Sequence, residues 1–203
     1  MNKLPYDFYC RNSVTLIARE LLGKVLVTQL DGVLTSGRIV ETEAYNGIVD
    51  KASHAWNDRR TNRTEVMYKE GGHAYVYLCY GIHYLFNVVT NKPGIPNAVL
   101  VRAIEPLEGI TLMQQRKKSS GPLKSLGAGP GNVARSLGLT TLHSGLTLFE
   151  DSLYIADDGF RVKRSEIVAG PRIGVDYAGE DALLPYRFFI KGNPFVSGKK
   201  QPA

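Results

Sequence analysis

Cysteine is scarce in this sequence, which has only Cys10 and Cys79 among its 203 residues. The two stand far apart, and there is neither a Cys-x-x-Cys pair nor a combined His and Cys zinc pattern. Disulfide frameworks and structural zinc sites both depend on such spacing. We therefore expect neither a disulfide framework nor a bound metal, and we interpret Cys79 as a small residue within a strand.

Long apolar runs are also missing. No segment approaches the roughly 18 consecutive apolar residues of a membrane-spanning helix, and Met1 to Tyr6 contain no apolar core of a signal peptide. We therefore expect no membrane partner and a cytoplasmic location. Hydrophobic residues make up 43% of the chain, enough for one good core. Residues 1–203 are expected to form a single domain with long functional loops.

Acidic residues are the minority among the charged ones. Asp and Glu total 19 against 25 Lys and Arg, which gives a formal net charge of +6. A basic surface favours an anionic partner such as nucleic acid, although many basic proteins bind nothing acidic.

Tyrosine, by contrast, is concentrated in one short segment. Residues 75–84 hold four tyrosines and one histidine within a pattern typical of a strand. Side chains alternate on a strand, so Tyr75 and Tyr77 would share one face and Val76 and Leu78 the other. Two interpretations follow. The segment alone favours a tyrosine-rich core; the alternative is a surface on which nucleobases stack, at roughly 1–3 kcal/mol per base.

Apolar periodicity and turn residues predict the other elements. Expected helices cover 14–22, 106–116 and 133–137. Expected strands cover 25–29, 33–40, which runs straight into 41–45, 85–90, 99–104, 146–148, 153–155, 172–175 and 186–190. Asp31-Gly32 predicts a hairpin turn. Residues 46–72 show no periodicity, and a loop of this length is usually functional or disordered. We expect an exposed loop at 116–122 and a loose tail at 199–203.

Polar residues at two strand positions are candidates for chemistry. Glu41 and Glu43 would project to the same side, and either could act as a base. In isolation the sequence favours a simpler role, in which both are solvated or paired with Arg38. Arg102 interrupts an apolar strand and needs a partner, for which Glu43 is one candidate. Asn87 interrupts another strand and fits a satisfied core amide.

Two further features could bind a nucleic acid. Tyr45 and His54 can both stack and form hydrogen bonds, and they stand at the start of the long loop and within it. The glycine-rich run 127–132 precedes an expected helix. Such a run can bind phosphate or form a plain turn into the helix, and the sequence leaves both open.

Three ordered blocks, Arg38 to Tyr45, Tyr75 to Gly81 and Val101 to Gly109, give the chain a specific likeness. It resembles the alkyladenine (3-methyladenine) DNA glycosylase family in its bacterial form, from Leu22 to Ser197. The resemblance implies an α+β fold: one mixed domain with a curved antiparallel β-sheet core and peripheral helices. It also implies a monomeric, nucleoid-associated enzyme that flips damaged purines out of double-stranded DNA and hydrolyses the N-glycosidic bond without a metal or cofactor.

The resemblance also implies a role for each matched residue. Glu43 matches the general base that activates water, and Arg102 the arginine that orients this water. Tyr80 matches the side chain that fills the space left by the flipped nucleotide. The remaining matches concern the base pocket: Tyr45 and Tyr77 as stacking walls, His54 as a stacking and hydrogen-bonding residue, Asn87 as the amide that rejects guanine, and Ala52 as a carbonyl that lines the pocket.

Contacts with the DNA backbone are expected from Arg63 and from Gly131 and Asn132 of the glycine-rich turn. The family usually carries lysine where this chain has Asn132, which weakens the expected phosphate contact. No amine nucleophile is matched, so the enzyme is expected to leave an abasic site without cutting the strand. The alternative is a non-catalytic module that binds damaged nucleic acid. A deaminase is disfavoured, because the His-x-Glu and Pro-Cys-x-x-Cys zinc signature is absent.

Overall fold

An antiparallel sheet is the centre of the computed structural model, which describes residues 1–118 and 120–198. Its strands are β1 (Asn2–Lys3), β2 (Val25–Leu30), β3 (Val33–Tyr45), β4 (Ala74–Cys79), β5 (His83–Thr90), β6 (Asn97–Glu108), β7 (Leu153–Asp157), β8 (Ile167–Gly170) and β9 (Arg187–Ile190). The α-helices are α1 (Tyr6–Tyr9), α2 (Val14–Glu20), α3 (Ile110–Lys117), α4 (Lys124–Gly127) and α5 (Pro130–Leu137). The 3-10 helices are η1 (Gly47–Val49), η2 (Trp56–Asp58), η3 (Glu65–Tyr68), η4 (Thr141–His143), η5 (Arg164–Glu166) and η6 (Asp176–Leu183).

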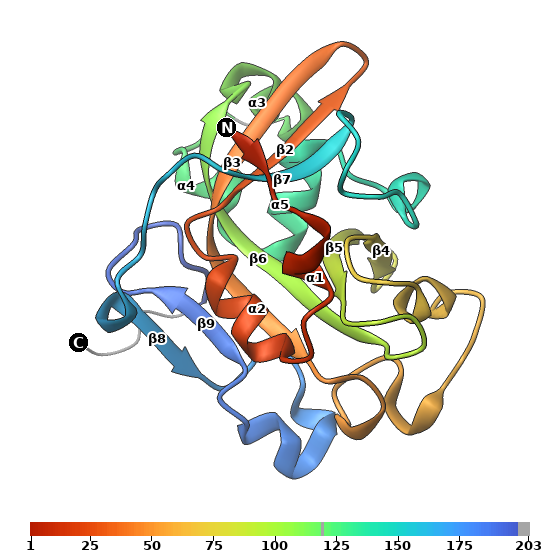
Figure 1. The fold of residues 1–203 in the computed structure, drawn as a ribbon. Helices are drawn as coiled ribbons and strands as arrows, with labels where there is room; N and C mark the ends of the chain where they lie inside the picture. Colours follow the sequence, from red (N-terminus) through yellow and green to blue (C-terminus); the bar gives the residue numbers. More distant parts are fainter. Residues whose placement is uncertain (119, 199–203) are drawn as a thin grey trace.

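Strand β3 organises the sheet because it changes partners along its length. The strand order is β1-β7-β2-β3-β6-β5-β4, and β9 pairs with β3 and β8. One edge of β3 pairs with β2 over residues 33–38 and with β9 over residues 41–43. Between these regions, its register with β6 shifts on either side of Glu41. Such irregularities bend a strand, and the sheet curls accordingly (Figure 1). The expected α+β class with a curved antiparallel sheet is confirmed.

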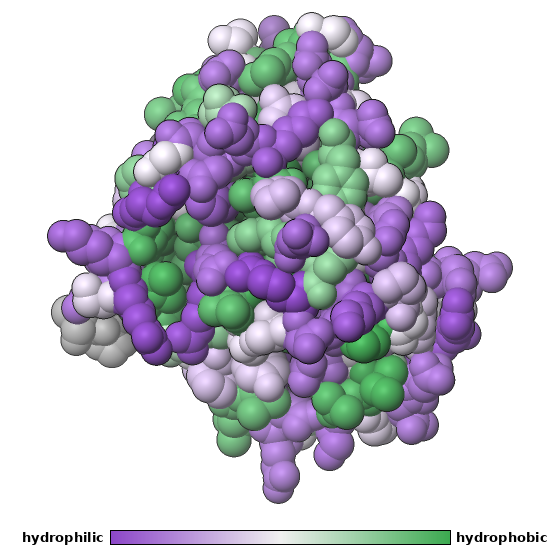
Figure 2. All heavy atoms as spheres, in the orientation of Figure 1, coloured by the Kyte–Doolittle hydropathy of each residue, from purple (hydrophilic) through white to green (hydrophobic). Residues whose placement is uncertain are grey.

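Helix α2 covers one face of this sheet (Figure 1). Ser13 caps its start by accepting a hydrogen bond from the Leu16 amide at 3.2 Å, as its residue type predicts. Ile17 and Ala18 are fully buried, and the Thr42 hydroxyl donates to the Ala18 carbonyl at 2.8 Å. Seen from this side, the surface is mostly hydrophilic, with smaller hydrophobic areas between the polar ones (Figure 2). None of the helices in the described residues is long and apolar enough to span a membrane.

The expected hairpin at Asp31-Gly32, helix 14–22 and most strands are confirmed, but four predictions are wrong. Residues 106–108 continue β6, because they pair with β3, and the helix begins only after Gly109, whose φ is +73°. Arg116 and Lys117 therefore lie in α3 and not in a loop. Residues 172–175 form no strand, and at 146–148 only an isolated bridge joins Thr147 to His73. Strand β8 was not expected, and the tail 199–203 lies outside the described residues.

Gly127 of α4 tests how closely the helices pack on the strand that carries Arg102. A Cβ atom at Gly127 would collide with the backbone carbonyl of Ile104 in β6. We predict that Gly127→Ala lowers the free energy of unfolding by about 2 kcal/mol, because a rigid backbone would have to shift. Urea denaturation measures this, with the exposed Lys124→Ala of the same helix as a control. Equal midpoints for both variants would contradict the close packing.

Candidate active site

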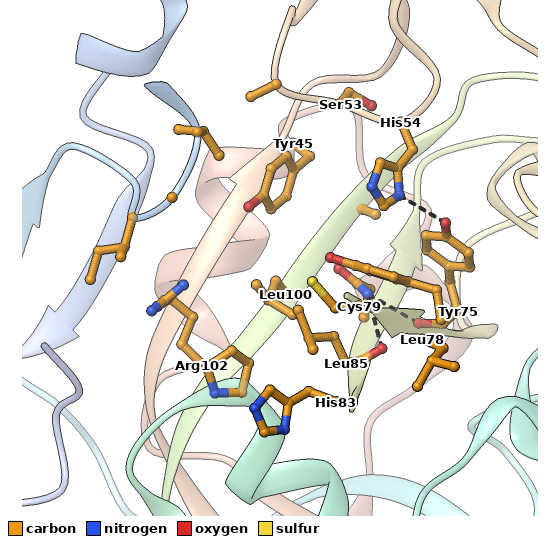
Figure 3. Close-up of a pocket in the computed structure, with 18 of the residues that line it drawn as sticks. Tyr45, Ser53, His54, Tyr75, Leu78, Cys79, His83, Leu85, Leu100 and Arg102 are labelled. Atoms are coloured by element: carbon orange, nitrogen blue, oxygen red, sulfur yellow. Dashed lines mark hydrogen bonds between the residues drawn. The ribbon is translucent and has the colours of Figure 1, made fainter. Parts of the chain in front are cut away.

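A pocket of about 850 Å³ lies where the β4–β5 hairpin, the segment 45–67, the start of α5 and the segment 173–177 meet. This volume falls within the range of about 300–1,000 Å³ that is usual for small-molecule sites. Arg102 enters from one side, while His54 and Tyr75 stand on the other and Tyr45 lies between them at one end (Figure 3). The long loop expected to be functional or disordered is ordered here and forms one wall.

Nearly all site residues expected from the sequence meet at this pocket. Of the expected residues, those that line it are Arg102, Tyr45, His54, Tyr77, Asn87, Ala52, Tyr80, Arg63, Gly131 and Asn132. Glu43 does not line the pocket and is fully buried. It lies behind two lining residues, Tyr45 and Arg102, to which it is bonded.

Three donors hold the buried Glu43 carboxylate. Oε1 accepts from the Ile173 amide at 2.8 Å and lies 3.2 Å from Nη1 of Arg102. Oε2 accepts from the Tyr45 hydroxyl at 2.9 Å. A carboxylate offers about four lone-pair positions, so Oε2 has room for one further donor. The simpler interpretation of a solvated or Arg38-paired Glu43 is wrong, because Arg38 pairs with Asp158 instead.

Glu41 has a different place from Glu43, although both project from β3. It is fully buried and accepts from Arg102 Nε at 3.1 Å, Arg187 Nε at 2.6 Å and the Ser197 amide at 2.7 Å. Like Glu43, it does not line the pocket, but all three donors to Glu43 do, whereas Arg187 and Ser197 do not. Glu41 is therefore the more remote of the two carboxylates. Buried charges need such partners to offset their loss of hydration. Arg102 is thereby fixed between two carboxylates.

The Tyr45 hydroxyl stays a hydrogen-bond donor to Glu43. Burial raises the pKa of Tyr45 well above its ordinary value, and the negative charge of Glu43 raises it further. The phenol is therefore protonated at neutral pH and fixes one carboxylate oxygen. Burial likewise raises the pKa of Tyr77.

The two tyrosines of β4 both line the pocket, but they differ in burial. Tyr75 is only 2% exposed, whereas Tyr77 is partly exposed at the pocket wall. Their rings stack at 5.4 Å with an interplanar angle of 29°, and His54 meets Tyr77 edge-on at 4.6 Å. The Tyr75 hydroxyl and His54 Nδ1 are 2.9 Å apart (Figure 3). The tyrosine-rich core that the segment alone favoured therefore holds for Tyr75, and the partly buried Tyr77 packs against the same cluster while it also lines the pocket.

Asn87 and Ala52 present fixed polar groups at the pocket. The Asn87 amide nitrogen donates to the Tyr75 carbonyl at 3.1 Å, which sets the orientation of its side chain. The Ala52 amide donates to Asp50, and its carbonyl accepts from the Tyr177 hydroxyl at 3.0 Å. Asn87 is thus a satisfied amide and also a lining residue.

Tyr80 projects from the tip of the β4–β5 hairpin. It is 89% exposed and adopts a φ of +49°, which is uncommon for a tyrosine. Arg63 is exposed beside the pocket. Gly131 lies at the start of α5, where an added Cβ would stand 3.0 Å from the His83 ring. Asn132 is engaged by the turn that precedes its helix, because its side-chain nitrogen donates to the Ala128 carbonyl at 2.7 Å.

Sequence reasoning missed the segment after β8, which supplies Ile173, Val175 and Tyr177 to the pocket. It was expected as a strand, and nothing in its periodicity indicates that a backbone amide would reach Glu43. Within residues 1–118 and 120–198, no group of three or more His, Cys, Asp or Glu side chains is arranged to hold a metal ion.

Comparison with known proteins gives a consistent result. A family model described as methylpurine-DNA glycosylase matches residues 7–194. Proteins with the provisional name 3-methyladenine DNA glycosylase are similar over nearly the whole chain. The protein from Bdellovibrio bacteriovorus is 43% identical, covering 97% of this chain and 99% of its own. Those from Clostridium acetobutylicum and Desulfitobacterium hafniense are 45% and 46% identical, covering 98% of this chain and 99% and 100% of their own.

We predict that His54 is neutral throughout the physiological pH range. Burial, followed by the positive charges of Arg63 and Arg59, lowers its pKa to about 4. In the unfolded chain its pKa is about 6.5, so the unfolded form binds the proton first as the pH falls. The stability that neutral His54 contributes is therefore complete above about pH 6.5 and is lost as the pH falls through about 4.

Titration of the histidine ring protons by NMR measures this pKa directly. Arg63→Gln should raise it, because one of the neighbouring positive charges is removed. A midpoint near 6.5 for His54 in the folded wild type would show that the imidazole is not desolvated as the structure indicates.

Proposed function

The chain belongs to the methylpurine-DNA glycosylase family, and from this membership we propose that it flips damaged purines out of duplex DNA into the pocket beside Glu43. As a member of that family it is a hydrolase that acts in base excision repair. We propose further that it takes alkylated and deaminated purines, acts as a monomer and leaves an abasic site uncut. Extrusion is required because the sugar C1′ is shielded within the stacked helix.

The held carboxylate of Glu43 is the observation that supports the chemistry most. With Oε1 held by Ile173 and Arg102, Oε2 is the oxygen with room for a water molecule. In the proposed step, water oxygen bonds to C1′ while the C1′–N bond breaks, the water proton passes to Glu43, and the purine leaves with the bonding electrons. Arg102 would orient the water. None of the groups that hold Glu43 is an amine that could attack C1′, and Lys51, which also lines the pocket, is exposed. This supports hydrolysis without strand cleavage.

The aromatic walls would select the base. Tyr45 and Tyr77 would stack on the two faces of the purine, and His54 would lie beside it as a neutral hydrogen-bonding group. Asn87 would clash with the amino group of unmodified guanine, because its side chain is fixed by the Tyr75 carbonyl. The Ala52 carbonyl would line the far end of the pocket.

The residues around the opening of the pocket would bind the DNA duplex. Tyr80 would enter the minor groove, and its large exposure at a hairpin tip next to the pocket supports this role. Arg63, Gly131 and Asn132 would contact the phosphate backbone, the latter two from the N-terminus of α5. The Asn132 side chain is already engaged by the Ala128 carbonyl, and its backbone amide by the Gly129 carbonyl at 3.0 Å. The amide of Gly131 is therefore the better candidate for that contact.

We predict that the wild type releases hypoxanthine or 7-methylguanine from a duplex with one lesion. Glu43→Gln should lower the single-turnover rate of release at least about 100-fold, as expected on loss of a general base. The variant keeps the shape of the side chain and should still bind lesion DNA. Hot-alkali cleavage at the abasic site measures release. The exposed Glu150→Gln is the control. If the wild type releases neither base, the proposed activity is wrong, and strand breakage before alkali would rule out the uncut product.

We predict that Tyr80→Ala impairs base flipping more than affinity for undamaged DNA. Phosphate contacts dominate non-specific binding, whereas the wedge acts only when a nucleotide has left the stack. Fluorescence of 2-aminopurine next to the lesion reports flipping, and a gel-shift assay with undamaged duplex reports affinity. Tyr80→Phe should behave as wild type, because the ring and not the hydroxyl fills the space. Equal losses in both assays for Tyr80→Ala would instead indicate a general DNA contact.

A further inference from the structure

Arg172 and Asp50 form a fully buried ion pair next to the pocket. Their side chains are 0% and 1% exposed, and the two guanidinium nitrogens donate to the two carboxylate oxygens at 2.5 and 2.8 Å. Neither residue lines the pocket. Neither can touch a bound base, so any effect on the reaction must pass through the groups that they hold.

This pair joins three segments of the active site. Arg172 also donates to the carbonyls of Ala44 and Asp181, at 2.9 and 3.0 Å. Asp50 also accepts from the amides of Asn46 and Ala52, both at 3.0 Å. The segments around 44–52 and around 181 lie side by side in the fold (Figure 1). The residue that follows Arg172 supplies the amide that bonds to Glu43.

The Arg172 guanidinium also contacts the ring of Tyr45. The Cζ atom of Arg172 lies 4.9 Å from the centroid of the Tyr45 ring, within the range of a cation–π contact. A positive charge is therefore fixed directly behind the ring on which a flipped purine is proposed to stack. Asp50 compensates that charge at hydrogen-bond distance.

Compensation of this charge matters because the lesions differ in charge. Purine nucleotides alkylated on N7 or N3 are cationic, whereas hypoxanthine is neutral. At an effective dielectric constant of about 20, two positive unit charges about 8 Å apart repel each other. This repulsion corresponds to a change in rate of roughly 10- to 30-fold. An unpaired Arg172 would therefore oppose the entry of a cationic base into the pocket through the Tyr45 ring and would not oppose the entry of a neutral base.

We infer that the Arg172–Asp50 pair positions Tyr45 and Ile173 and neutralises the charge behind Tyr45, so that the pocket accepts cationic as well as neutral purines. This rests on the proposed function. The pair is a positioning and specificity-determining element and takes no part in the chemical step.

Single-turnover rates with enzyme below saturation, which include entry of the base into the pocket, test the inference on two duplexes, one with 7-methylguanine, which is cationic, and one with hypoxanthine. The measured quantity is the ratio of the two rates, in which any loss of folded enzyme cancels. Asp50→Asn should lower the ratio of cationic to neutral release about 10-fold, because Arg172 loses its counter-charge. Arg172→Gln should raise the ratio, because Asp50 is then uncompensated. Asp50→Glu keeps the charge and should keep the wild-type ratio even if both rates fall.

The chain contains a matched control in Arg38 and Asp158. Two nitrogens of Arg38 bond to Asp158 at 3.1 and 2.7 Å, and its Cζ lies 4.2 Å from the Phe160 ring centroid, but neither partner lines the pocket. Asp158→Asn should therefore leave the ratio unchanged. For a variant too slow to excise, the ratio is taken from equilibrium binding to the two duplexes.

The opposite signs expected for the two single variants separate charge from structure. If Asp50→Asn and Arg172→Gln both leave the ratio at its wild-type value, or shift it in the same direction, the pair is only structural and the inference is overturned. If the wild type releases neither base, the proposed function itself is wrong. This outcome differs from an unchanged ratio, which overturns only the inference about the ion pair.

Discussion

Burial of the Glu43 carboxylate against Arg102 is the constraint on which the site depends. A carboxylate without water needs fixed donors, and each donor here comes from a different part of the chain. Glu43 and Tyr45 lie on β3, Arg102 on its neighbour β6, and Ile173 on the segment after β8. The pairing of β3 with β6 and the return of the chain after β8 are therefore conditions for a correctly held carboxylate.

Charge compensation extends one layer further from the pocket. Arg102 is shared with Glu41, which is in turn shared with Arg187 of β9 and the Ser197 amide. On the other side, Arg172 and Asp50 compensate each other behind Tyr45. These groups are buried and each has an opposite charge in contact, so the pocket is surrounded by fixed dipoles. Preorganised dipoles of this kind stabilise developing charge without having to reorient during the reaction.

The sequence predicted the parts of this site that depend on local pattern. Alternation along β4 placed Tyr75 and Tyr77 on one face, and the Arg102 charge within an apolar strand correctly demanded a partner such as Glu43. It could not predict contacts between distant segments, because the Ile173 amide and Arg172 carry no periodic signal. It also misjudged the end of β6, where pairing with β3 outweighs the helical pattern around Pro106.

A double-mutant cycle on the single-turnover rate shows whether Glu43 and Arg102 act as one unit on the attacking water. The cycle compares wild type, Glu43→Gln, Arg102→Gln and the double variant on one lesion duplex. If Arg102 acts through Glu43 and its water, the double variant should be about as slow as Glu43→Gln alone. Losses that multiply in the double variant would show that the two residues act independently and would contradict the account.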